Sequence, residues 1–362
     1  MSMEWFIGGL VITTLPLLWL LFCKHYNILE HKKRANFYNR KPVPNAQGIF
    51  LRITLMTLIV IFGYNFLGNS YMLIYITATT ILGIVATIDL FYPISSWIRL
   101  IIQIVIFGSV VIYGKVEIDI IRIGMTDYNI PTRIGQMGSV LWFIICTNAV
   151  NRFDGIEGQS SGVTAIGSLS LRAVVTFVVF PTYINLTPNI IEQLTITQII
   201  SLSLWVVSLV YTCIEYKPQG LIRDIGTIIY GFSLAYLALL GGAKMWTLIV
   251  VLSLVMFDRL RVVINRIIVM KKNPLHGDYT HLHHRLLANG WTRNEVRRFV
   301  WIRSFVMTIL MILQWTQSIH KRIIMIMMAV LFFGVMIYLF WIKKLPFEYK
   351  IDFKPDEVIT LE

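Results

Sequence analysis

Three of the seven histidines in the chain lie within four residues of one another, in the stretch DYTHLHHRLLANG. By type alone, His281, His283 and His284 could bind a metal ion, transfer protons or hold an anion. No cysteine and no HExxH pattern accompanies them, which argues against zinc. Arg285 follows directly and Lys271 lies upstream, so the cluster is cationic and its donors suit phosphate oxygens. A patch of interfacial histidines without a ligand would have the same pattern.

A second polar segment, NAVNRFDGIEGQSSG, combines amides, carboxylates and glycines. Asn148 and Asn151 are three residues apart, and so are Asp154 and Glu157. Their oxygens suit a hydrated divalent cation or sugar hydroxyl groups. The glycines would let the backbone approach a phosphate closely. A polar turn between two membrane helices explains the composition equally well.

Single acids mark the ends of three other apolar segments. Asp224 stands where one segment begins, so it could complement a helix dipole or bind magnesium at the edge of a cavity. Asp89 and Asp258 stand where segments end, a position that is electrostatically unfavourable for a carboxylate. Three arginines follow Asp258, and contact with anionic lipid headgroups is the simplest explanation for them.

The composition indicates the environment of these residues. Of the 362 residues, 56% are hydrophobic and only 14% are charged, and the mean hydropathy of +0.70 indicates an integral membrane protein. The net charge of +13 is explained by cytoplasmic lysines and arginines, so no nucleic-acid partner is expected. The three cysteines form no CxxC pair, so neither a disulfide nor a zinc ribbon is expected. The start MSME has no basic residue, which indicates a retained helix rather than a cleaved signal peptide.

Eleven apolar segments approach the length of roughly 20 residues that a membrane-spanning helix needs, which predicts an all-α integral membrane protein. They lie near residues 5–23, 48–67, 71–88, 95–113, 136–150, 160–181, 197–214, 225–242, 245–258, 301–316 and 321–342. We expect one polytopic transmembrane domain over residues 1–342 and a cytoplasmic tail over residues 343–362.

Lysines and arginines predict the orientation of these helices. With the N-terminus outside, 22 of the 32 fall in inside segments and 6 in outside loops. The positive-inside rule therefore predicts an outside N-terminus and a cytoplasmic C-terminus. The outside segment 114–135 alternates apolar and polar residues, which predicts a hairpin. The acids, the asparagine segment and the histidine cluster then all lie in loops on the cytoplasmic face.

Four motifs, in this order along the chain, resemble those of the polyprenyl-phosphate N-acetylhexosamine-1-phosphate transferases. They are the basic stretch RKPVPNAQG from Arg40 to Gly48, Asn148-Ala149-x-Asn151-x-x-Asp154-Gly155-x-Glu157-Gly158, Pro218 with Asp224 and Gly226, and the HLHHRLL segment from His281. The resemblance covers roughly residues 24–300, and the eleven-helix layout also resembles that family. The histidine segment resembles the GlcNAc-1-phosphate branch, which includes the enzymes that start O-antigen and teichoic-acid linkage units, rather than the muramoyl-pentapeptide branch.

The resemblance implies a reaction in which undecaprenyl phosphate, or another polyprenyl phosphate, attacks a UDP-N-acetylhexosamine and UMP is released. GlcNAc is the expected sugar. This reaction would be the first membrane step of cell-envelope glycan synthesis, for lipopolysaccharide or teichoic acid, in a bacterial-type plasma membrane. Mg²⁺ is the implied cofactor, with Mn²⁺ as a substitute. The other implied partners are membrane lipids and a second copy of the chain, in a homodimer.

By the same resemblance, Asp89, Asp154 and Asp224 are the expected catalytic residues. The metal would be held by Asp224, Asp154 and Asn151. The expected substrate-binding residues are Asn148, Asn151, Arg152, Glu157, Arg223, His281, His283, His284 and Arg285, of which the last four would hold the diphosphate of the nucleotide sugar.

The chain also departs from the family's pattern. Leu90 stands where the family has the second of two aspartates, and Gly220 stands where it has a lysine. In one hypothesis Asp89 still serves as base or orienting acid, and Arg152 or Arg223 supplies the missing positive charge. In a second, the protein is a pseudoenzyme that binds lipid phosphate or a nucleotide sugar. A third is a membrane transporter, for which the charges within the membrane would be Arg52, Arg99, Arg172 and Arg303.

Overall fold

Helices make up most of the structure because an apolar segment in lipid can satisfy its backbone hydrogen bonds only within itself. The computed structural model describes residues 3–25, 43–123, 126–182, 186–217, 219–241, 245–268, 270–271, 281–316 and 321–337. The predicted tail 343–362, Pro218 and the Arg40 end of the basic stretch lie outside the described residues.

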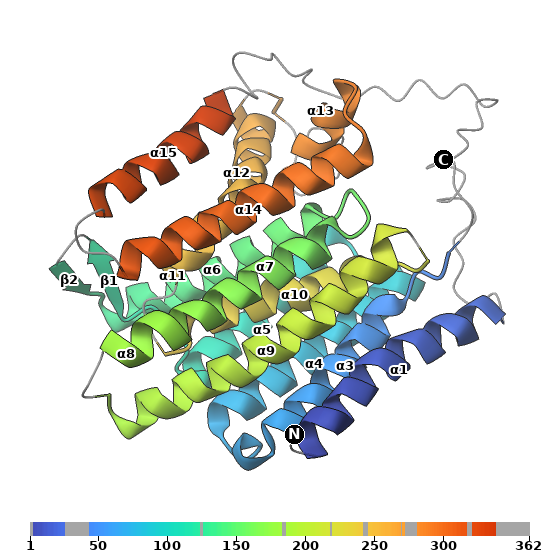
Figure 1. The fold of residues 1–362 in the computed structure, drawn as a ribbon, viewed down its shortest axis with the longest axis horizontal. Helices are drawn as coiled ribbons and strands as arrows, with labels where there is room; N and C mark the ends of the chain where they lie inside the picture. Colours follow the sequence, from blue (N-terminus) through green and yellow to red (C-terminus); the bar gives the residue numbers. More distant parts are fainter. Residues whose placement is uncertain are drawn as a thin grey trace.

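In the part of the first half that the structure describes, the chain forms five long helices and one hairpin, which Figure 1 labels. The helices are α1 (Met3–His25), α3 (Gln47–Phe62), α4 (Ser70–Phe91), α5 (Ser96–Gly114) and α6 (Thr132–Arg152), with a short 3₁₀ turn at Tyr64–Phe66. The hairpin pairs β1 (Ile120–Ile123) antiparallel with β2 (Thr126–Asn129). A hairpin in segment 114–135 is therefore confirmed, while its location outside the membrane stays a prediction.

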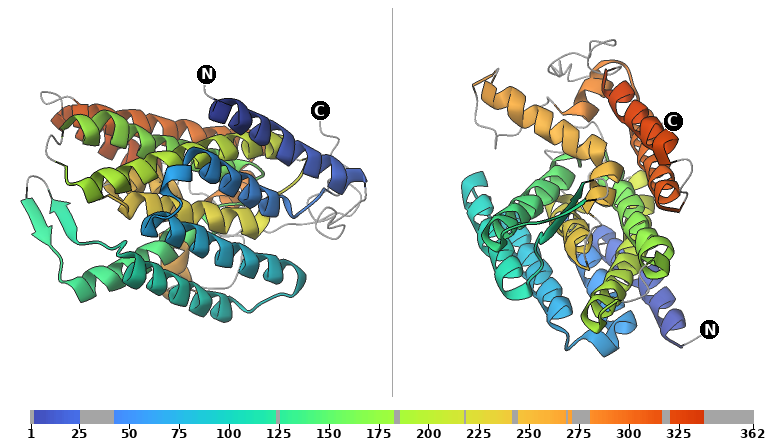
Figure 2. Two further views of the ribbon diagram at one scale, coloured as in Figure 1. Left: turned by 90° about the horizontal axis from the view of Figure 1, so that it is seen from below. Right: turned by 90° about the vertical axis from the view of Figure 1, so that its left-hand side faces the viewer.

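The second half packs around and beside the first. Its long helices are α7 (Gln159–Val174), α9 (Pro188–Tyr216), α10 (Arg223–Leu239), α12 (Ser253–Ile268), α14 (Arg293–Thr316) and α15 (Lys321–Ile337). The shorter ones are α8 (Phe180–Thr182), which continues α7 through a π-helical turn at Val175–Val179, α11 (Met245–Val251) and α13 (Leu282–Ala288). Helix α12 diverges from the bundle (Figure 2).

Each of the eleven predicted apolar segments lies on helix, and the chain is an all-α membrane protein apart from the hairpin. Among the described residues, five helices are long and apolar enough to cross a membrane by length and composition: Ile7–His25, Ser70–Phe91, Ser96–Gly114, Gln159–Val179 and Pro188–Tyr216. The number of eleven crossings and the orientation stay predictions. The ninth segment, 245–258, differs from a single helix, because it breaks at Leu252 between α11 and α12.

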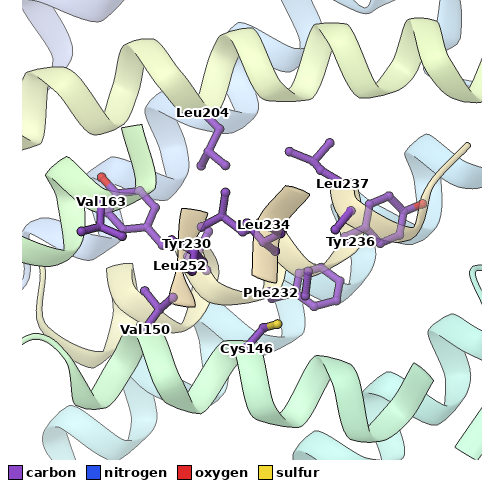
Figure 3. Packing of buried hydrophobic residues seen from close by; sticks show 14 of the residues in the cluster. Cys146, Val150, Val163, Leu204, Tyr230, Phe232, Leu234, Tyr236, Leu237 and Leu252 are labelled. Carbon is purple, nitrogen blue, oxygen red and sulfur yellow. The ribbon is translucent and has the colours of Figure 1, made fainter. Parts of the chain in front are cut away.

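Helix α10 forms the centre of the apolar core. Its residues are buried on every side against α3, α4, α6 and α7. Tyr230, Phe232 and Leu234 of α10 lie in this core among Cys146 and Val150 of α6 and Val163 of α7 (Figure 3). The two helices approach closely at Gly231, where an added Cβ would lie 2.6 Å from the Cα of Thr147. A helix that is apolar all round must lie inside the bundle, which places its polar first turn beside the neighbouring helix ends.

Candidate active site

The predicted site residues meet at one end of the bundle, where α4, α6 and α9 end and α5, α7 and α10 begin (Figures 1 and 2). Hydrogen bonds between these helix ends connect the motifs. Asn151 Nδ2, in the last turn of α6, donates to Thr227 Oγ1 in the first turn of α10 at 2.8 Å. Asn148 Nδ2, one turn earlier, donates to Gln103 Oε1 of α5 at 2.8 Å. Because both amide nitrogens are used, the amide oxygens are the groups that these side chains can offer a ligand.

Arg99 joins two of the predicted catalytic acids. Its Nη1 lies 2.7 Å from Asp89 Oδ2 and 3.5 Å from Asp224 Oδ2. The second oxygen of Asp89 accepts the backbone N–H of Ile94 at 2.7 Å. The Asp89 side chain is 13% exposed, whereas that of Asp224 is 50% exposed. Asp89 therefore fixes the guanidinium, and Asp224 is the carboxylate that remains open to a ligand.

Sequence reasoning assigned no role in this site to Arg99. Arg99 lies within a predicted membrane span. The position of a residue along an apolar segment does not show which other helix ends lie beside it in the fold. The available signal was its place at the start of α5, ten residues after Asp89 and on the same polar side of the membrane.

The two carboxylates of the NAVNRFDGIEG motif have different surroundings. Asp154 Oδ1 accepts the hydroxyl of Ser160 at 2.8 Å. Both carboxylate oxygens of Glu157 accept from Arg293 Nη1 at 2.8 Å, and Arg297 Nη1 donates to the Glu157 carbonyl at 2.7 Å. Glu157 therefore holds the start of α14 against the α6–α7 loop, and its role in substrate binding stays a prediction.

At the glycines of this motif, side chains from other parts of the chain approach the backbone. An added Cβ at Gly155 would lie 1.8 Å from His283 Nε2, and one at Gly162 would lie 2.2 Å from Trp301 Nε1. Gly158 has a φ of 74°, in the left-handed region that favours glycine. In the described residues the groups that approach these glycines are histidine and tryptophan rings, and the approach of a phosphate stays a prediction.

The three histidines occupy different environments at the start of α13. His281 and His283 are buried, with their rings parallel and 5.9 Å apart, whereas His284 is partly exposed. The His283 ring also lies edge-on to Phe153, at 6.3 Å between centroids. Burial, and then the charges of His284 and His281, lower the pKa of His283 well below its ordinary value. His283 is therefore a neutral packing residue, while His284 is the ring most open to a ligand.

Two further side chains complete the histidine segment. Asp258 of α12, which is almost fully buried, accepts from His281 Nδ1 at 2.8 Å. Arg285 is buried beside them, and burial, together with the charge of Arg261, lowers its pKa to about 10. Arg285 therefore stays positively charged at neutral pH. Sequence reasoning noted Asp258 only as an acid at a helix end, because its partner lies 23 residues further along the chain.

A cavity of about 540 Å³ opens beside these groups, between α5, α6, α10, α12 and α15. Polar side chains nearest the helix ends line part of its wall: Ser96, Arg99, Asn151, Arg152 and Arg259. Side chains further along the helices are mainly apolar: Ile144, Ile145, Ile228, Ile249, Met256 and Phe332. The cavity therefore suits a molecule with an anionic head and an apolar chain.

The sequence model of glycosyl transferase family 4 matches residues 72–242, from α4 to the end of α10. A Bacillus subtilis (strain 168) protein named "Probable undecaprenyl-phosphate N-acetylglucosaminyl 1-phosphate transferase" is 29% identical over 207 residues. Residues 72–242 are thus similar to glycosyl transferase family 4. The aligned part covers 54% of this chain and 53% of the Bacillus subtilis relative, so the chain spans about half the length of that relative.

The positions at which this chain departs from the family's motif pattern have structural explanations. Leu90 packs, partly buried, against the apolar core. A side chain at Gly220 would meet Gln47, whose Cγ would lie 2.7 Å from an added Cβ, so the lysine position is filled by a neighbouring helix. Arg152 lines the cavity, and Arg223 begins α10 with a φ of 53°. Of these two arginines, Arg152 is the one that the structure places in the cavity wall.

The residues predicted to hold a metal offer only oxygen atoms. Within the part of the chain that the structure describes, no group of three His, Cys, Asp or Glu side chains could hold a metal ion by itself. Magnesium keeps several water ligands and needs few protein oxygens, so Asp224, Asp154 and the Asn151 amide fit its chemistry. Asn151 bonds to Thr227, one turn from Asp224, and Asp154 follows Asn151 by three residues.

Proposed function

We propose that this protein transfers N-acetylhexosamine-1-phosphate from a UDP-sugar to a polyprenyl phosphate and releases UMP. The observation that carries the proposal is that Asn151 and Arg99, the partner of Asp224, lie at a cavity with a polar and an apolar part, while the histidine segment packs on the loop that follows Asn151. GlcNAc is the proposed sugar and undecaprenyl phosphate the proposed acceptor, supported by the HLHHRLL segment and by the name of the Bacillus subtilis relative.

The cavity supports the assignment of the acceptor. Arg99, Arg152 and Arg259 can hold the lipid phosphate through charge-assisted hydrogen bonds, while the apolar wall covers the first part of the lipid chain. A cavity of this volume holds a ligand of drug size, so most of a polyprenyl chain must extend into the bilayer. Exposed apolar residues of α5, among them Ile98, Ile101 and Val105, provide a surface for lipid beside the cavity.

Magnesium, when bound, would neutralise the diphosphate and make its terminal phosphorus easier to attack. Asp224, Asp154 and Asn151 would hold it. His284 and Arg285 would contact the diphosphate oxygens of the sugar nucleotide. A lipid-phosphate oxygen then attacks the phosphorus linked to the sugar, the bond to the uridine-bearing phosphate breaks, and UMP leaves with that electron pair.

In this reaction Asp89 orients Arg99 and does not act as a base that removes a proton from the acceptor. Both of its oxygens already accept hydrogen bonds, from Arg99 and from the backbone of Ile94. A phosphate monoester has a second pKa of about 6, so the acceptor is already largely deprotonated at neutral pH. We therefore assign Asp89 to the orientation of Arg99.

The polytopic membrane protein is proposed to lie in a bacterial plasma membrane with this site on the cytoplasmic face. Cytoplasmic placement is supported by the distribution of lysine and arginine along the sequence. The product would be the first lipid-linked intermediate of a cell-envelope glycan, such as lipopolysaccharide or teichoic acid.

One observation favours a pseudoenzyme as the second candidate: Leu90 provides no acid where the family motif has one. The arginines that prompted the transporter hypothesis have local partners instead. Arg52 donates to Thr80, Arg172 to the Gln198 carbonyl, and Arg303 to Ser253. Such hydrogen bonds between neighbouring helices are those of packing residues.

The test is an assay of the purified protein in detergent with Mg²⁺, undecaprenyl phosphate and labelled UDP-GlcNAc. We expect a lipid-linked sugar phosphate and UMP from the wild type, and neither from Asp224→Asn or after chelation of Mg²⁺. Asp119→Asn, the same change in an exposed residue before the hairpin, is the matched control and should retain full activity. Binding without turnover, across a panel of UDP-N-acetylhexosamines, would instead support the pseudoenzyme.

A further inference from the structure

Asp258 is a buried carboxylate to which the proposed reaction gives no role. It lies in α12, the helix that diverges from the bundle (Figure 2), and only 1% of its surface is exposed. A buried carboxylate is costly unless hydrogen bonds and charges compensate for its lost hydration. Its partners therefore indicate what the position requires.

Both oxygens of Asp258 bind the beginning of the histidine segment. Oδ2 lies 2.8 Å from His281 Nδ1, and Oδ1 accepts the backbone N–H of Leu282 at 2.8 Å. Leu282 is the first residue of α13, and its cap residue His281 makes no side-chain cap of its own. Asp258 therefore caps α13 from another helix and, with the same carboxylate, holds the imidazole of the cap residue.

This arrangement determines which nitrogen of His281 faces a ligand. An ionised carboxylate can only accept, so the hydrogen of the shared bond belongs to Nδ1, and Nε2 is left for a substrate. The parallel ring of His283, 5.9 Å away, packs on Gly155 and so brings His281 towards the loop that contains Asp154. Charged or titratable neighbours around the pair are His284, Arg285, Arg261 and Arg293.

We propose that Asp258 is a positioning residue for nucleotide-sugar binding, which holds His281 with Nδ1 protonated and directs Nε2 towards the diphosphate. The inference rests on the proposed function for the identity of the ligand, but not for the geometry of the pair. Held in this way, an imidazolium at His281 would donate from Nε2 to a phosphate oxygen through a charge-assisted hydrogen bond. Loss of Asp258 would affect substrate binding only through its effect on His281.

Two substitutions separate this role from simple capping. In Asp258→Asn the amide oxygen can still accept from Leu282, but the amide N–H must face His281 Nδ1, which moves the ring hydrogen to Nε2. Asp258→Ala removes both contacts. A residue that only caps α13 would tolerate Asn and not Ala, whereas a residue that positions His281 would tolerate neither.

The experiment combines kinetics with ¹⁵N NMR of histidine-labelled protein, in which His281→Gln identifies the His281 signals. For Asp258→Asn we expect kcat/KM for UDP-GlcNAc to fall about 10- to 100-fold, the usual effect of removing the partner of a functional histidine. KM for undecaprenyl phosphate should be unchanged, and the His281 signals should change to those of an Nε2–H ring. Asp258→Glu should recover part of the loss, and Asp119→Asn is again the control.

The proposal and the proposed function can fail separately. If Asp258→Asn has wild-type kinetics and an unchanged His281 tautomer, the positioning role is wrong even if transfer is observed. If the wild type transfers no sugar phosphate, the proposed function is wrong, and Mg²⁺–UDP binding becomes the readout for the pair. Weaker UDP binding in Asp258→Asn, together with the tautomer change, would then still support the positioning role, whereas equal binding would overturn it.

Discussion

The imidazole of His283 lies directly against the backbone of Gly155, so closely that no Cβ could fit between them. This contact joins the two most characteristic motifs of the sequence, which lie far apart in the chain. It places the histidine segment on the α6–α7 loop, beside the asparagines and acids of the proposed magnesium site.

Gly155→Ala should therefore separate the two motifs. The added methyl group would overlap the ring, a kind of overpacking that typically costs about 1–3 kcal/mol. We expect a lower Tm in detergent and a large loss of transfer activity. Gly68→Ala is the matched control, because Gly68 also lies in a turn and an added Cβ there meets nothing within 4 Å. Adding His283→Ala should restore stability to Gly155→Ala; if it does not, the contact is not the cause.

Arg99→Gln should weaken acceptor binding. The substitution removes the ion pair with Asp89 and one of the cations in the cavity wall. Loss of a charged hydrogen bond of about 1.5–3 kcal/mol corresponds to a rise of tenfold or more in KM for undecaprenyl phosphate. KM for UDP-GlcNAc should change less, and Arg99→Lys should be intermediate. Steady-state kinetics with each substrate varied in turn would measure this, with Arg133→Gln, an exposed arginine at the start of α6, as control. Equal rises in both KM values would contradict the assignment.

Leu90→Asp distinguishes the active enzyme from the pseudoenzyme. Leu90 is partly buried against the apolar core, so a carboxylate there should lower stability. If Asp89 and Arg99 already do what the reaction requires, kcat should not rise. A substantial gain of transfer activity in Leu90→Asp would show that the wild-type site is impaired. The measurement is kcat together with Tm for the variant and the wild type.

The first turn of α14 should give the protein a defined acid sensitivity. The backbone N–H and hydroxyl of Thr292 donate to Glu295 Oε2 at 2.7 and 2.9 Å, and these bonds hold the pKa of Glu295 below its ordinary value. Because the folded-state pKa is the lower one, this stabilisation is present above the ordinary value of 4.5 and is lost as pH falls through the folded-state pKa.

We therefore expect wild type to have a higher Tm than Glu295→Gln at pH 7, and the difference to disappear as the pH falls through the lowered folded-state pKa of Glu295. The same helix turn carries Arg293 and Arg297, which hold Glu157, so acidification should also loosen the α6–α7 loop. Thermal unfolding across pH tests this prediction, with Asp119→Asn as a control for exposed carboxylates in general. A Tm difference that persists at pH 3 would contradict it.

The apolar segments alone were sufficient to predict the helices, because the hydrogen bonds of a helix are local and an apolar run needs no distant partner to form one. The hairpin near residue 125 followed from alternation of apolar and polar residues in the same local way. The break at Leu252 was not predicted, since α11 and α12 read as one continuous apolar run and diverge only where other helices pack against them.

The motif residues could be found from sequence because their types and order are distinctive, but their roles depended on contacts over long distances in the chain. Arg99 reaches Asp224 across 125 residues, and Arg293 reaches Glu157 across 136. No local pattern encodes such pairs, so the sequence assigned Glu157 to substrate binding and left Arg99 and Asp258 without roles in the site.

The sequence by itself determined that this is a helical membrane protein with polar motifs at helix ends that resemble those of a sugar-phosphate transferase family. Only the tertiary structure decided which motif residues are exposed and which hold the helices together. The physical reason is that burial and pairing, rather than residue type, set the charge and accessibility of a side chain. His283 and His284 are neighbours of one type, yet one is a buried ring packed on Gly155 and the other lies partly exposed beside Arg285.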